Sequence, residues 1–437
     1  MTDPGAEMER RIDTEGIDHV FVEFADVNGI ARSKQITADY FLDSWESGFT
    51  MNLLLLVQTP RNAVPEGSGY GAEVDYADGV VVPDPSTYKR LPWRDDAARV
   101  ICDFHYDGDP VGGAPRTVLE RVLARADERA PDLDFYAGSE LEFYLLTDEE
   151  DDYEPATSDK HECVSWATEA VAPFYDRLAE WAPEYGIDLH SLQHEHGAGQ
   201  LEVLFDYGSV LDQADTTFDF RRLVKQTAHL TDHEATFMAK PYGDREGSGY
   251  HLHLSAFDDG ENAFAPADGE GLSERGRHFV GGLLAHADAV AALSTPNPNA
   301  FKRYDPDGFA PYAAAWGLDN RMTAIRVPHG VPRIENRIAS ADANPYLVMA
   351  ATLAAGLDGL ERELDPGDPY EGNPAGDAPA LPQSLPAALS ALEDDDVLCE
   401  YLGEELVRAY VATKREEREA YRTTVTPWER EQYVETL

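Results

Sequence analysis

Hydrophobic and polar residues alternate along positions 18–24, and an extended pattern resumes at 31–36 after the turn sequence DVNG at 26–29. Strict alternation is typical of a strand with one buried face, and a Gly-containing turn between two such runs predicts a β-hairpin. Further strands are predicted at 79–82 and 99–104. The first hundred residues are therefore expected to form a small sheet.

A stretch rich in Gly, Pro and Asp at 107–116 interrupts this pattern. Such residues mark loops, so we place the domain boundary there and divide the chain into residues 1–107 and 108–437. The larger part mixes both periodicities, with strands predicted at 134–146, 200–205, 249–256 and 322–327. Helices are predicted from residue 117 to 130 and at 164–185, 216–233, 274–293, 344–363 and 402–422. The acidic, Pro-rich stretch 364–386 is predicted to be a solvated surface connection.

The charge of the chain changes what it can bind. Its 437 residues include 83 Asp and Glu against 35 Lys and Arg, which gives a formal net charge of −48. Such a surface repels phosphate backbones and anionic lipid, so binding to nucleic acid or membranes through net charge is excluded. With 43% hydrophobic residues the chain still has enough apolar surface for a core.

Only seven of the basic residues are Lys. Acidic excess with few Lys resembles proteins of salt-accumulating microbes, in which molar salt screens self-repulsion. Three cysteines without CxxC spacing indicate a reducing compartment, and the first residues show no cationic start followed by an apolar run. We therefore expect a cytoplasmic protein from a halophilic background.

Two carboxylates stand two residues apart in the predicted strand FYAGSELEFYLL, at Glu140 and Glu142. The two-residue period of a strand aims both at one face, where like charges repel unless a cation lies between them. A solvent-facing pair on an edge strand is the alternative.

In HEHGAGQLEVLF, Glu195 and Glu202 bracket a turn of small residues that could bring both to a common point. An ordinary surface hairpin is the alternative here.

The segment GSGYHLHLS places His251 and His253 on one face of a strand. A lone His is more often a core residue than a ligand, but four carboxylates elsewhere make this pair a better candidate. Sites rich in carboxylates with at most one imidazole suit Mg²⁺ or Mn²⁺ better than Zn²⁺.

Arginine is concentrated in the segment 321–337, which holds four guanidinium groups and a single acid, Glu335. Arg forks are the usual receptors for phosphate and carboxylate oxygens, and Arg303 in AFKRYDP is a plausible fifth. Carboxylates for two metals beside guanidinium groups serve phosphoryl transfer. No GxxxxGK[ST] or GxGxxG motif appears, so the arrangement is neither a P-loop nor a protein kinase. The four groups of the segment are Arg321, Arg326, Arg333 and Arg337.

Seven ordered blocks, among them SELEFYL, HEHGAGQLE, KPYGDREGSGYHLHLS, NAFKRY and RIENR, resemble the glutamine synthetase family over essentially the whole chain. The resemblance implies an α+β fold: an N-terminal β-grasp domain, then a larger catalytic domain with a curved antiparallel sheet flanked by helices. It also implies that ATP phosphorylates the γ-carboxylate of glutamate and that an amine displaces the phosphate.

Carried over by position, the resemblance gives each residue a role. One metal is expected at Glu142, Glu195 and Glu202, and the other at Glu140, His251 and Glu335. The ATP contacts are expected at His253, Ser255, Arg326 and Arg333. Glutamate is expected at Arg303, Arg337 and the backbone of Gly247, and the transferred phosphoryl group at Arg321.

The chain departs from the family where the amine binds. Phe309 in GFAPY stands where the family has the Glu that takes a proton from ammonium, and Glu246 stands where it has Asn. A pocket that exchanges a carboxylate for Phe should hold an alkyl chain better than a small cation. The FAP and Trp316-Gly317 pattern resembles the branch that ligates glutamate to polyamines and other amines. Glu246 is a candidate general base, or a clamp for the far ammonium of a diamine.

We therefore expect ligation of glutamate to an organic amine or polyamine, with Mg²⁺ or Mn²⁺ in two or more sites and ATP as co-substrate. Ammonium as the acceptor is one alternative, and a non-catalytic oligomer of the same fold is another. The resemblance also implies a homododecamer of two stacked rings whose active sites are shared between neighbouring subunits.

Overall fold

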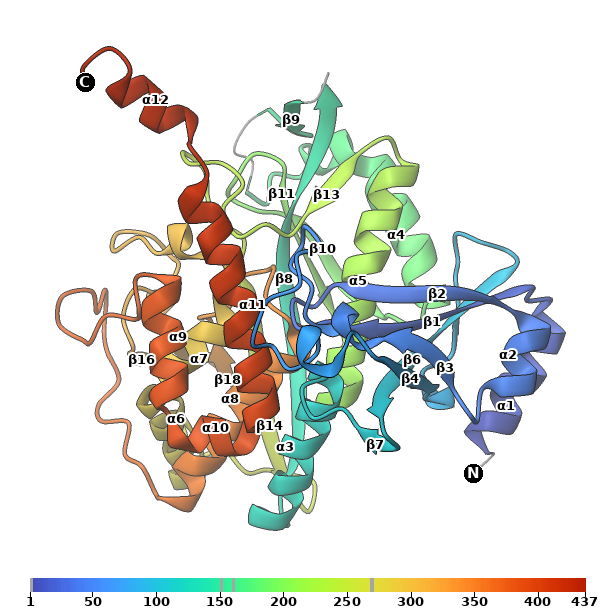
Figure 1. Cartoon of the computed structure of the whole chain (residues 1–437). Coiled ribbons are helices and arrows are strands. Elements are labelled where there is room, and N and C mark those ends of the chain that lie inside the picture. Colours follow the sequence, from blue (N-terminus) through green and yellow to red (C-terminus); the bar gives the residue numbers. More distant parts are fainter. Residues whose placement is uncertain (1–2, 150–151, 159–161, 268–270) are drawn as a thin grey trace.

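Two β-sheets organise the chain (Figure 1), of which the computed structural model describes residues 3–149, 152–158, 162–267 and 271–437. Within these residues the first sheet has seven strands, in the order β2-β1-β6-β4-β3, with β5 and β7 attached to β6. Its strands are β1 (His19–Ala25), β2 (Ala31–Thr37), β3 (Phe49–Asn52), β4 (Asp78–Pro83), β5 (Lys89–Arg90), β6 (Ala97–Tyr106) and β7 (Asp109–Pro110).

The hairpin predicted at the start of the chain is confirmed as β1 and β2, which pair antiparallel from His19↔Thr37 to Ala25↔Ala31. The carboxylate of Asp26 closes the turn by accepting hydrogen bonds from the backbone N–H groups of Asn28 and Ile30, each at 2.9 Å. Gly29 completes this turn at φ 73°, a conformation that costs Gly little. The strands expected at 79–82 and 99–104 are confirmed as β4 and β6.

The second sheet is built around the 16-residue strand β8 and curls across the middle of the molecule (Figure 1). It has eleven strands within the described residues, in the order β10-β11-β8-β14-β18-β17-β16, with four short strands attached to β8 or β14. The expected strand at 322–327 is wrong for its first half, because only the last three of those residues, β17, are extended. The bounds are β8 (Asp134–Glu149), β9 (Asp152–Pro155), β10 (Leu189–His194), β11 (Gln200–Phe205), β12 (Gly208–Ser209), β13 (Glu234–Thr236), β14 (Tyr250–Asp258), β15 (Glu261–Asn262), β16 (Trp316–Leu318), β17 (Ile325–Val327) and β18 (Ile334–Asn336).

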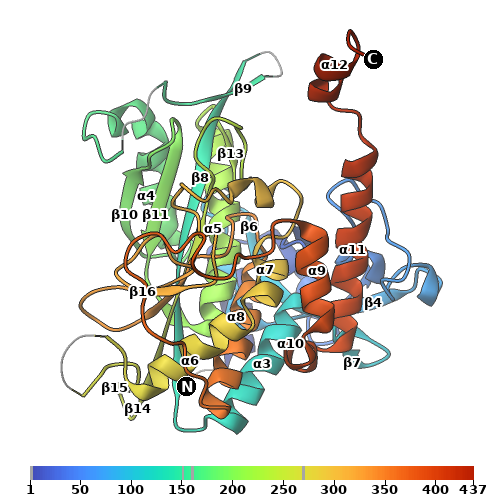
Figure 2. The same cartoon turned by 90° about the vertical axis from the view of Figure 1, so that its left-hand side faces the viewer.

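Helices pack around both sheets, and Figure 2 shows α3, α6, α8 and α10 gathered in one layer beside the second sheet. The helix α8 is apolar on nearly all sides and is buried along almost its whole length. The helices are α1 (Pro4–Glu15), α2 (Ala38–Ser44), α3 (Pro115–Arg129), α4 (Ala172–Glu184), α5 (Val210–Leu230), α6 (Glu274–Ala285), α7 (Ala287–Ser294), α8 (Pro345–Glu361), α9 (Leu385–Asp394), α10 (Asp396–Leu402), α11 (Glu404–Thr423) and α12 (Pro427–Tyr433).

The single helix predicted at 274–293 is wrong, because the chain forms two helices, α6 and α7, that meet at His286. The imidazole of this residue bridges two carboxylates: Nδ1 lies 2.6 Å from Asp395 and Nε2 lies 2.9 Å from Asp358. The residue that separates the helices thus contacts two elements much further along the chain. The helix predicted at 164–185 also starts later than expected, at Ala172, after a short 3₁₀ turn.

Buried ion pairs join the first sheet to helix α5 of the second part. Arg99 on β6 pairs with Asp219, and both side chains are about 1% exposed. Arg116 at the start of α3 binds both carboxylate oxygens of Asp215 on α5, at 3.1 and 3.2 Å, and also contacts Asp103 on β6 of the first sheet at 2.9 Å. Removing one partner of such a pair leaves an uncompensated buried charge, so these contacts fix how the two parts sit on each other.

The C-terminal helix α12 projects from the body beyond α11 (Figures 1 and 2). None of its residues is buried within this chain. Of the helices in the described part of the chain, none is both long and apolar enough to cross a bilayer.

Candidate active site

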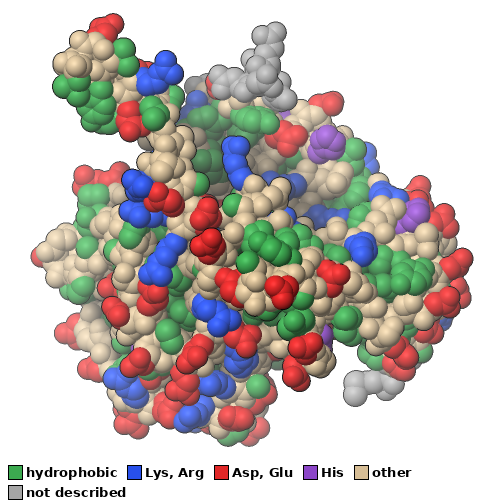
Figure 3. Space-filling model, in the orientation of Figure 1, with side chains coloured by type: hydrophobic (Ala, Val, Ile, Leu, Met, Phe, Trp, Pro, Cys, Tyr) green, Lys and Arg blue, Asp and Glu red, His purple; other side chains and the backbone are tan. Residues whose placement is uncertain are grey.

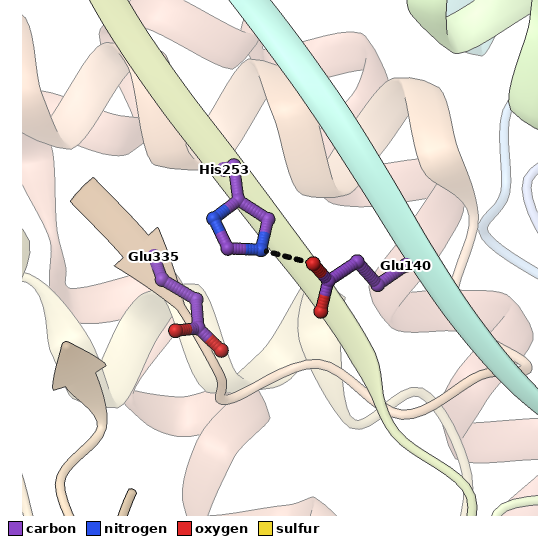
Figure 4. A group of neighbouring side chains, drawn as sticks. All are labelled: Glu140, His253 and Glu335. Atoms are coloured by element: carbon purple, nitrogen blue, oxygen red, sulfur yellow. Dashed lines mark ion pairs between the residues drawn. The ribbon is translucent and has the colours of Figure 1, made fainter. Parts of the chain in front are cut away.

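Three neighbouring strands bring the predicted metal ligands together. In the registers of β8 with β14 and of β14 with β18, His251 lies opposite Glu140, and His253 lies opposite Glu335. Alternate residues of a strand share a face, so both imidazoles and both carboxylates point to the same side of the sheet. Figure 4 shows three of these side chains, Glu140, His253 and Glu335, turned toward one another from three strands.

The closest contact in this group joins His253 Nε2 to Glu140 Oε1 at 2.9 Å. His251 Nδ1 lies 3.5 Å from the other Glu140 oxygen and 3.9 Å from Glu335. Burial raises the pKa of the Glu140 carboxyl, but the adjacent imidazoles of His251 and His253 outweigh that effect and hold the pKa well below its usual range. Glu140 is therefore an anion in this site.

A second group of carboxylates lies one strand further along. Glu202 on β11 lies opposite Glu142 on β8, and Gln193 on β10 lies opposite Glu202. The Gln193 amide donates to Glu195 at 2.7 Å and to Glu202 at 2.6 Å. Gln193 was not among the residues predicted for the site, because its contact with Glu202 depends on the pairing of β10 with β11.

These carboxylates fit a divalent cation. Potential ligand atoms of Glu140, Glu202 and His251 lie within 4.8 Å of one another, and so do those of Glu140, His253 and Glu335. Burial and the neighbouring carboxylates, Glu142 first among them, raise the pKa of Glu202 to about 9. Oxygen-rich donors of this kind suit Mg²⁺ or Mn²⁺. The first of these sets unites members of the two predicted metal sites, and the assignment of ligands to each metal stays a prediction.

Glu335 sits between two guanidinium groups. Arg326 lies 2.8 Å from one of its carboxylate oxygens and Arg337 lies 2.6 Å from the other. Burial raises the pKa of Glu335, but His251, Arg337, His253 and Arg326 together lower it to about 2. A predicted ATP contact, Arg326, and a predicted glutamate contact, Arg337, thus both form ion pairs with Glu335, which is itself a predicted metal ligand.

The two remaining predicted ATP contacts are Arg333 and Ser255. Arg333 donates from Nε to His253 Nδ1 at 3.0 Å, so its guanidinium lies against the imidazole that contacts Glu140. Ser255 follows His253 on the same face of β14 and lies opposite Tyr136 of β8. The structure therefore places His253 and Ser255 on β14, Arg326 on β17, and Arg333 directly before β18.

Arg303 and Gly247, both predicted to bind glutamate, pack directly on each other. The Arg303 side chain is buried, and it donates to the carbonyl oxygen of Ile338 at 3.2 Å. Burial lowers the pKa of Arg303. The Gln200 amide donates to the carbonyl of Gly247 at 3.2 Å and to Glu142 at 2.9 Å, which ties this backbone to the carboxylate group.

Arg321 differs from the other predicted residues because its side chain is exposed, in the turn between β16 and β17. Its positive charge opposes the rise in the pKa of Glu202, so it lies within electrostatic range of the carboxylate group. An exposed cation at the edge of a site can stabilise a charge that develops there.

The residues predicted to handle the amine lie on loops. The Glu246 carboxylate is 3.4 Å from His196 Nε2, and the backbone carbonyl of Glu246 accepts a hydrogen bond from the Tyr144 hydroxyl at 2.9 Å. The other ring nitrogen of His196 lies 3.1 Å from Glu162. Phe309 is 69% exposed in the loop after Arg303.

Trp316 has a structural role in this chain. Its indole is buried, and its N–H donates to the carbonyl of Gly367 at 3.2 Å. Arg277 lies over the ring, 5.7 Å from its centroid. Trp316 therefore fixes the surface connection that the sequence predicts at 364–386.

Three comparisons with known proteins point to the same family. The model of the family "Glutamine synthetase, catalytic domain" matches residues 112–433. The glutamine synthetase of Halobacterium salinarum is 36% identical, over 97% of this chain and 95% of that protein. The gamma-glutamylethanolamide synthetase GlnA4 of Streptomyces coelicolor is 35% identical, over 94% of this chain and 92% of that protein. A solved structure described as apo GmaS without ligand superimposes with a TM-score of 0.88 at 32% identity, covering 99% of this chain and all of the other. Together with the carboxylate, imidazole and guanidinium groups above, these matches show that the chain belongs to the glutamine synthetase family and is an ATP-dependent ligase that forms C–N bonds.

Proposed function

We propose that this enzyme joins the γ-carboxylate of glutamate to an organic amine, through a γ-glutamyl phosphate. The observation that carries the proposal is Phe309, a largely exposed aromatic side chain at the position where the family resemblance expects the ammonium-binding Glu. Two acids precede Phe309 in the same loop, Asp305 and Asp307, and the Asp305 carboxylate accepts a hydrogen bond from the backbone N–H of Asp307 at 3.0 Å, which shapes the local turn. The Streptomyces relative whose name refers to a glutamyl ethanolamide supports an organic acceptor.

The residues divide the reaction between them. Arg303 and Arg337 would hold the two ends of glutamate, while Arg326 and Arg333 would hold the phosphates of ATP. Divalent cations at the carboxylate groups would neutralise phosphate charge. As the γ-phosphoryl group moves to the glutamate carboxylate, Arg321 would stabilise the charge that spreads over it. A free carboxylate is a poor electrophile, and this step converts it into an acyl phosphate.

The attacking amine must lose a proton, because alkyl ammonium groups have a pKa close to the 10.4 of Lys. Glu246, with His196 beside it, is our candidate for the group that accepts this proton or binds a distant ammonium. Glu246→Gln should lower kcat/KM for amines, and an unchanged value for every amine would exclude both roles.

Phosphate release measured with ATP, Mg²⁺ and glutamate tests the acceptor, with ammonium compared against methylamine, ethanolamine, putrescine and spermidine. We expect turnover with at least one organic amine and little with ammonium. Turnover with ammonium alone would refute the proposal, and no turnover with any acceptor would favour the non-catalytic alternative. Phe309→Glu should raise the ratio of ammonium to amine turnover, whereas Tyr40→Glu, at another exposed aromatic residue, on α2, should not.

We also propose a homododecamer with active sites shared between subunits. Apolar side chains of α12 and of the residues after it are exposed in a single chain, among them Trp428 at 59% and Val434 at 72% exposure. Burying such a patch against a second copy would be favourable. A mass in molar salt that corresponds to a monomer would refute the proposal.

The charge of −48 suggests that the enzyme works in a salt-rich cytoplasm. Ions at molar concentration would screen the electrostatic repulsion between surface acids. Unfolding curves recorded from low to molar KCl test this expectation, and equal stability at all concentrations would refute it.

A further inference from the structure

A cavity of about 660 Å³ lies where the first sheet meets helix α5. One wall is the β1–β2 turn, from Asn28 to Ala31, and the opposite wall is the face of α5 that carries Phe218, Arg221 and Lys225. A cavity of this size is in the range that holds small-molecule ligands. None of its lining residues belongs to the predicted ATP, glutamate or metal contacts.

The lining is positive although the protein is strongly negative. Arg221, Arg222 and Lys225 face the cavity, and Asp342 is the single acid among its lining residues. Arg221 and Lys225 are four positions apart and so lie on the same side of the helix. Lys225 is moreover one of only seven lysines in 437 residues. Three cations and one acid are the reverse of the balance found in the chain as a whole.

The carboxylate of Asp342 is already engaged, because it accepts hydrogen bonds from the side chains of Asn297 and Ser340. Burial lowers the pKa of Arg221 to about 10, and the charge of Asp342 opposes that effect without forming an ion pair with Arg221 among the described residues. Its terminal nitrogen donates to the carbonyls of Ala341 and Ala343, and its Nε is buried without a partner in the part of the chain described. A desolvated cation without a direct ion-pair partner is costly, and a bound anion would supply that partner.

The remaining walls are apolar. Ile30, Phe218, Phe237 and Met238 line the cavity, and Met238 is 41% exposed. In the space-filling view, Lys and Arg side chains gather in and around a hollow in the upper part of the face, near the place where β13 and α5 lie in Figure 1 (Figure 3). Such a lining suits a ligand with a charged group at one end and an uncharged body at the other.

We propose that this cavity binds a small organic anion, whose carboxylate or phosphate oxygens contact Arg221 and Lys225 while its body lies against Phe237 and Met238. Arg222 adds positive charge but already pairs with the buried Glu23. Arg221 also holds the carbonyls of Ala341 and Ala343, which follow shortly after Arg337 in the chain. The site is therefore separate from the reaction centre yet connected to the segment that carries a predicted glutamate contact.

Calorimetric titration of the full chain tests the proposal, in the salt at which it is folded and with ADP, Mg²⁺ and glutamate present to fill the reaction site. The probes are citrate, inorganic phosphate and glycerol 3-phosphate. We expect at least one to bind to the unmodified protein and to Arg418→Gln, a control at an exposed cation on α11. Lys225→Gln should weaken that binding about tenfold or more. Binding of citrate identifies a carboxylate site and binding of glycerol 3-phosphate a phosphate site, whereas binding of inorganic phosphate alone would overturn the contacts proposed for the organic body.

Met238→Glu provides a second variant that leaves every cation in place. It adds a negative charge at the exposed wall and should abolish binding of the same probe while the melting temperature stays unchanged. No binding by any of the three probes, or equal affinity for the unmodified protein and Lys225→Gln, would overturn the proposal. The proposed amine ligation is measured by phosphate release, so the failure of one proposal leaves the other standing.

Discussion

Gly247 lies directly against the stem of Arg303, so that a Cβ atom added at Gly247 would be 2.2 Å from Arg303 Cγ. The same atom would lie 2.8 Å from the carbonyl oxygen of Ala239. The absence of a side chain at Gly247 is therefore what lets the guanidinium stem lie where it does.

Gly247→Ala should displace Arg303 and lower kcat/KM for glutamate about 100-fold, because misplacing a substrate-binding group by about 1 Å costs that much. Steady-state kinetics at saturating ATP measure the effect. Gly243→Ala is the matched control, since a Cβ at Gly243 meets no atom within 4 Å. Equal kinetics for both variants would show that Arg303 does not bind glutamate.

Glu140→Gln should raise the Mg²⁺ concentration needed for half-maximal activity and lower kcat about 100-fold or more. The change removes a negative charge that two imidazoles hold in its ionised form, while it preserves size and shape. Glu128→Gln, at an exposed acid on α3, should change neither quantity. A Mg²⁺ dependence identical to that of the unmodified enzyme would exclude Glu140 as a metal ligand.

Asp219→Asn should destabilise the protein by about 3–5 kcal/mol, because it leaves the buried guanidinium of Arg99 without its counter-charge. Lys89 Nζ, 2.9 Å from the same carboxylate, would lose its partner as well. Denaturant unfolding in high salt gives the free energy. Glu419→Gln breaks the exposed pair with Arg422 and should cost less than about 1 kcal/mol. Similar losses for both variants would contradict the proposed interdomain role.

The His286 bridge predicts how stability depends on pH. Burial lowers the pKa of His286, but hydrogen bonds to Asp395 and Asp358 outweigh it and raise the pKa above 6.5. The unfolded chain then releases this proton at lower pH than the folded chain does, so the contribution to stability is complete below pH 6.5 and is lost as the pH rises through the folded pKa.

Melting temperatures measured from pH 6 to 9 should therefore fall for the unmodified protein, and the fall should be smaller for His286→Gln. His229→Gln, at an exposed His near the end of α5, is the control and should follow the unmodified curve. Identical slopes for all three proteins would show that His286 stays neutral.

The alternation of hydrophobic and polar residues predicted those elements that depend on residues close together in the sequence. Alternation placed Glu140 and Glu142 on one strand, and His251 and His253 on another, and both strands exist as β8 and β14. The family resemblance then identified the fold and the chemistry.

Other features depend on contacts that the local sequence does not encode. The break between α6 and α7 coincides with contacts of His286 to residues 72 and 109 positions away, which the apolar pattern of 274–293 does not report. The register that sets His253 opposite Glu335 likewise arises only when distant strands pair. The bridging role of Gln193 was missed for the same reason, because its partner Glu202 lies on the neighbouring strand.

The strand β8 carries Glu140 and Glu142 in its middle and pairs with strands on both sides. Any mutation that shifts it would disturb most of the sheet, whereas Glu246 and Phe309 sit on loops where a substitution moves little else. Substitutions that change the amine acceptor can therefore arise without disturbing the residues that activate the carboxylate. A family built in this way should diversify in the acceptors it uses far more readily than in the bond it forms.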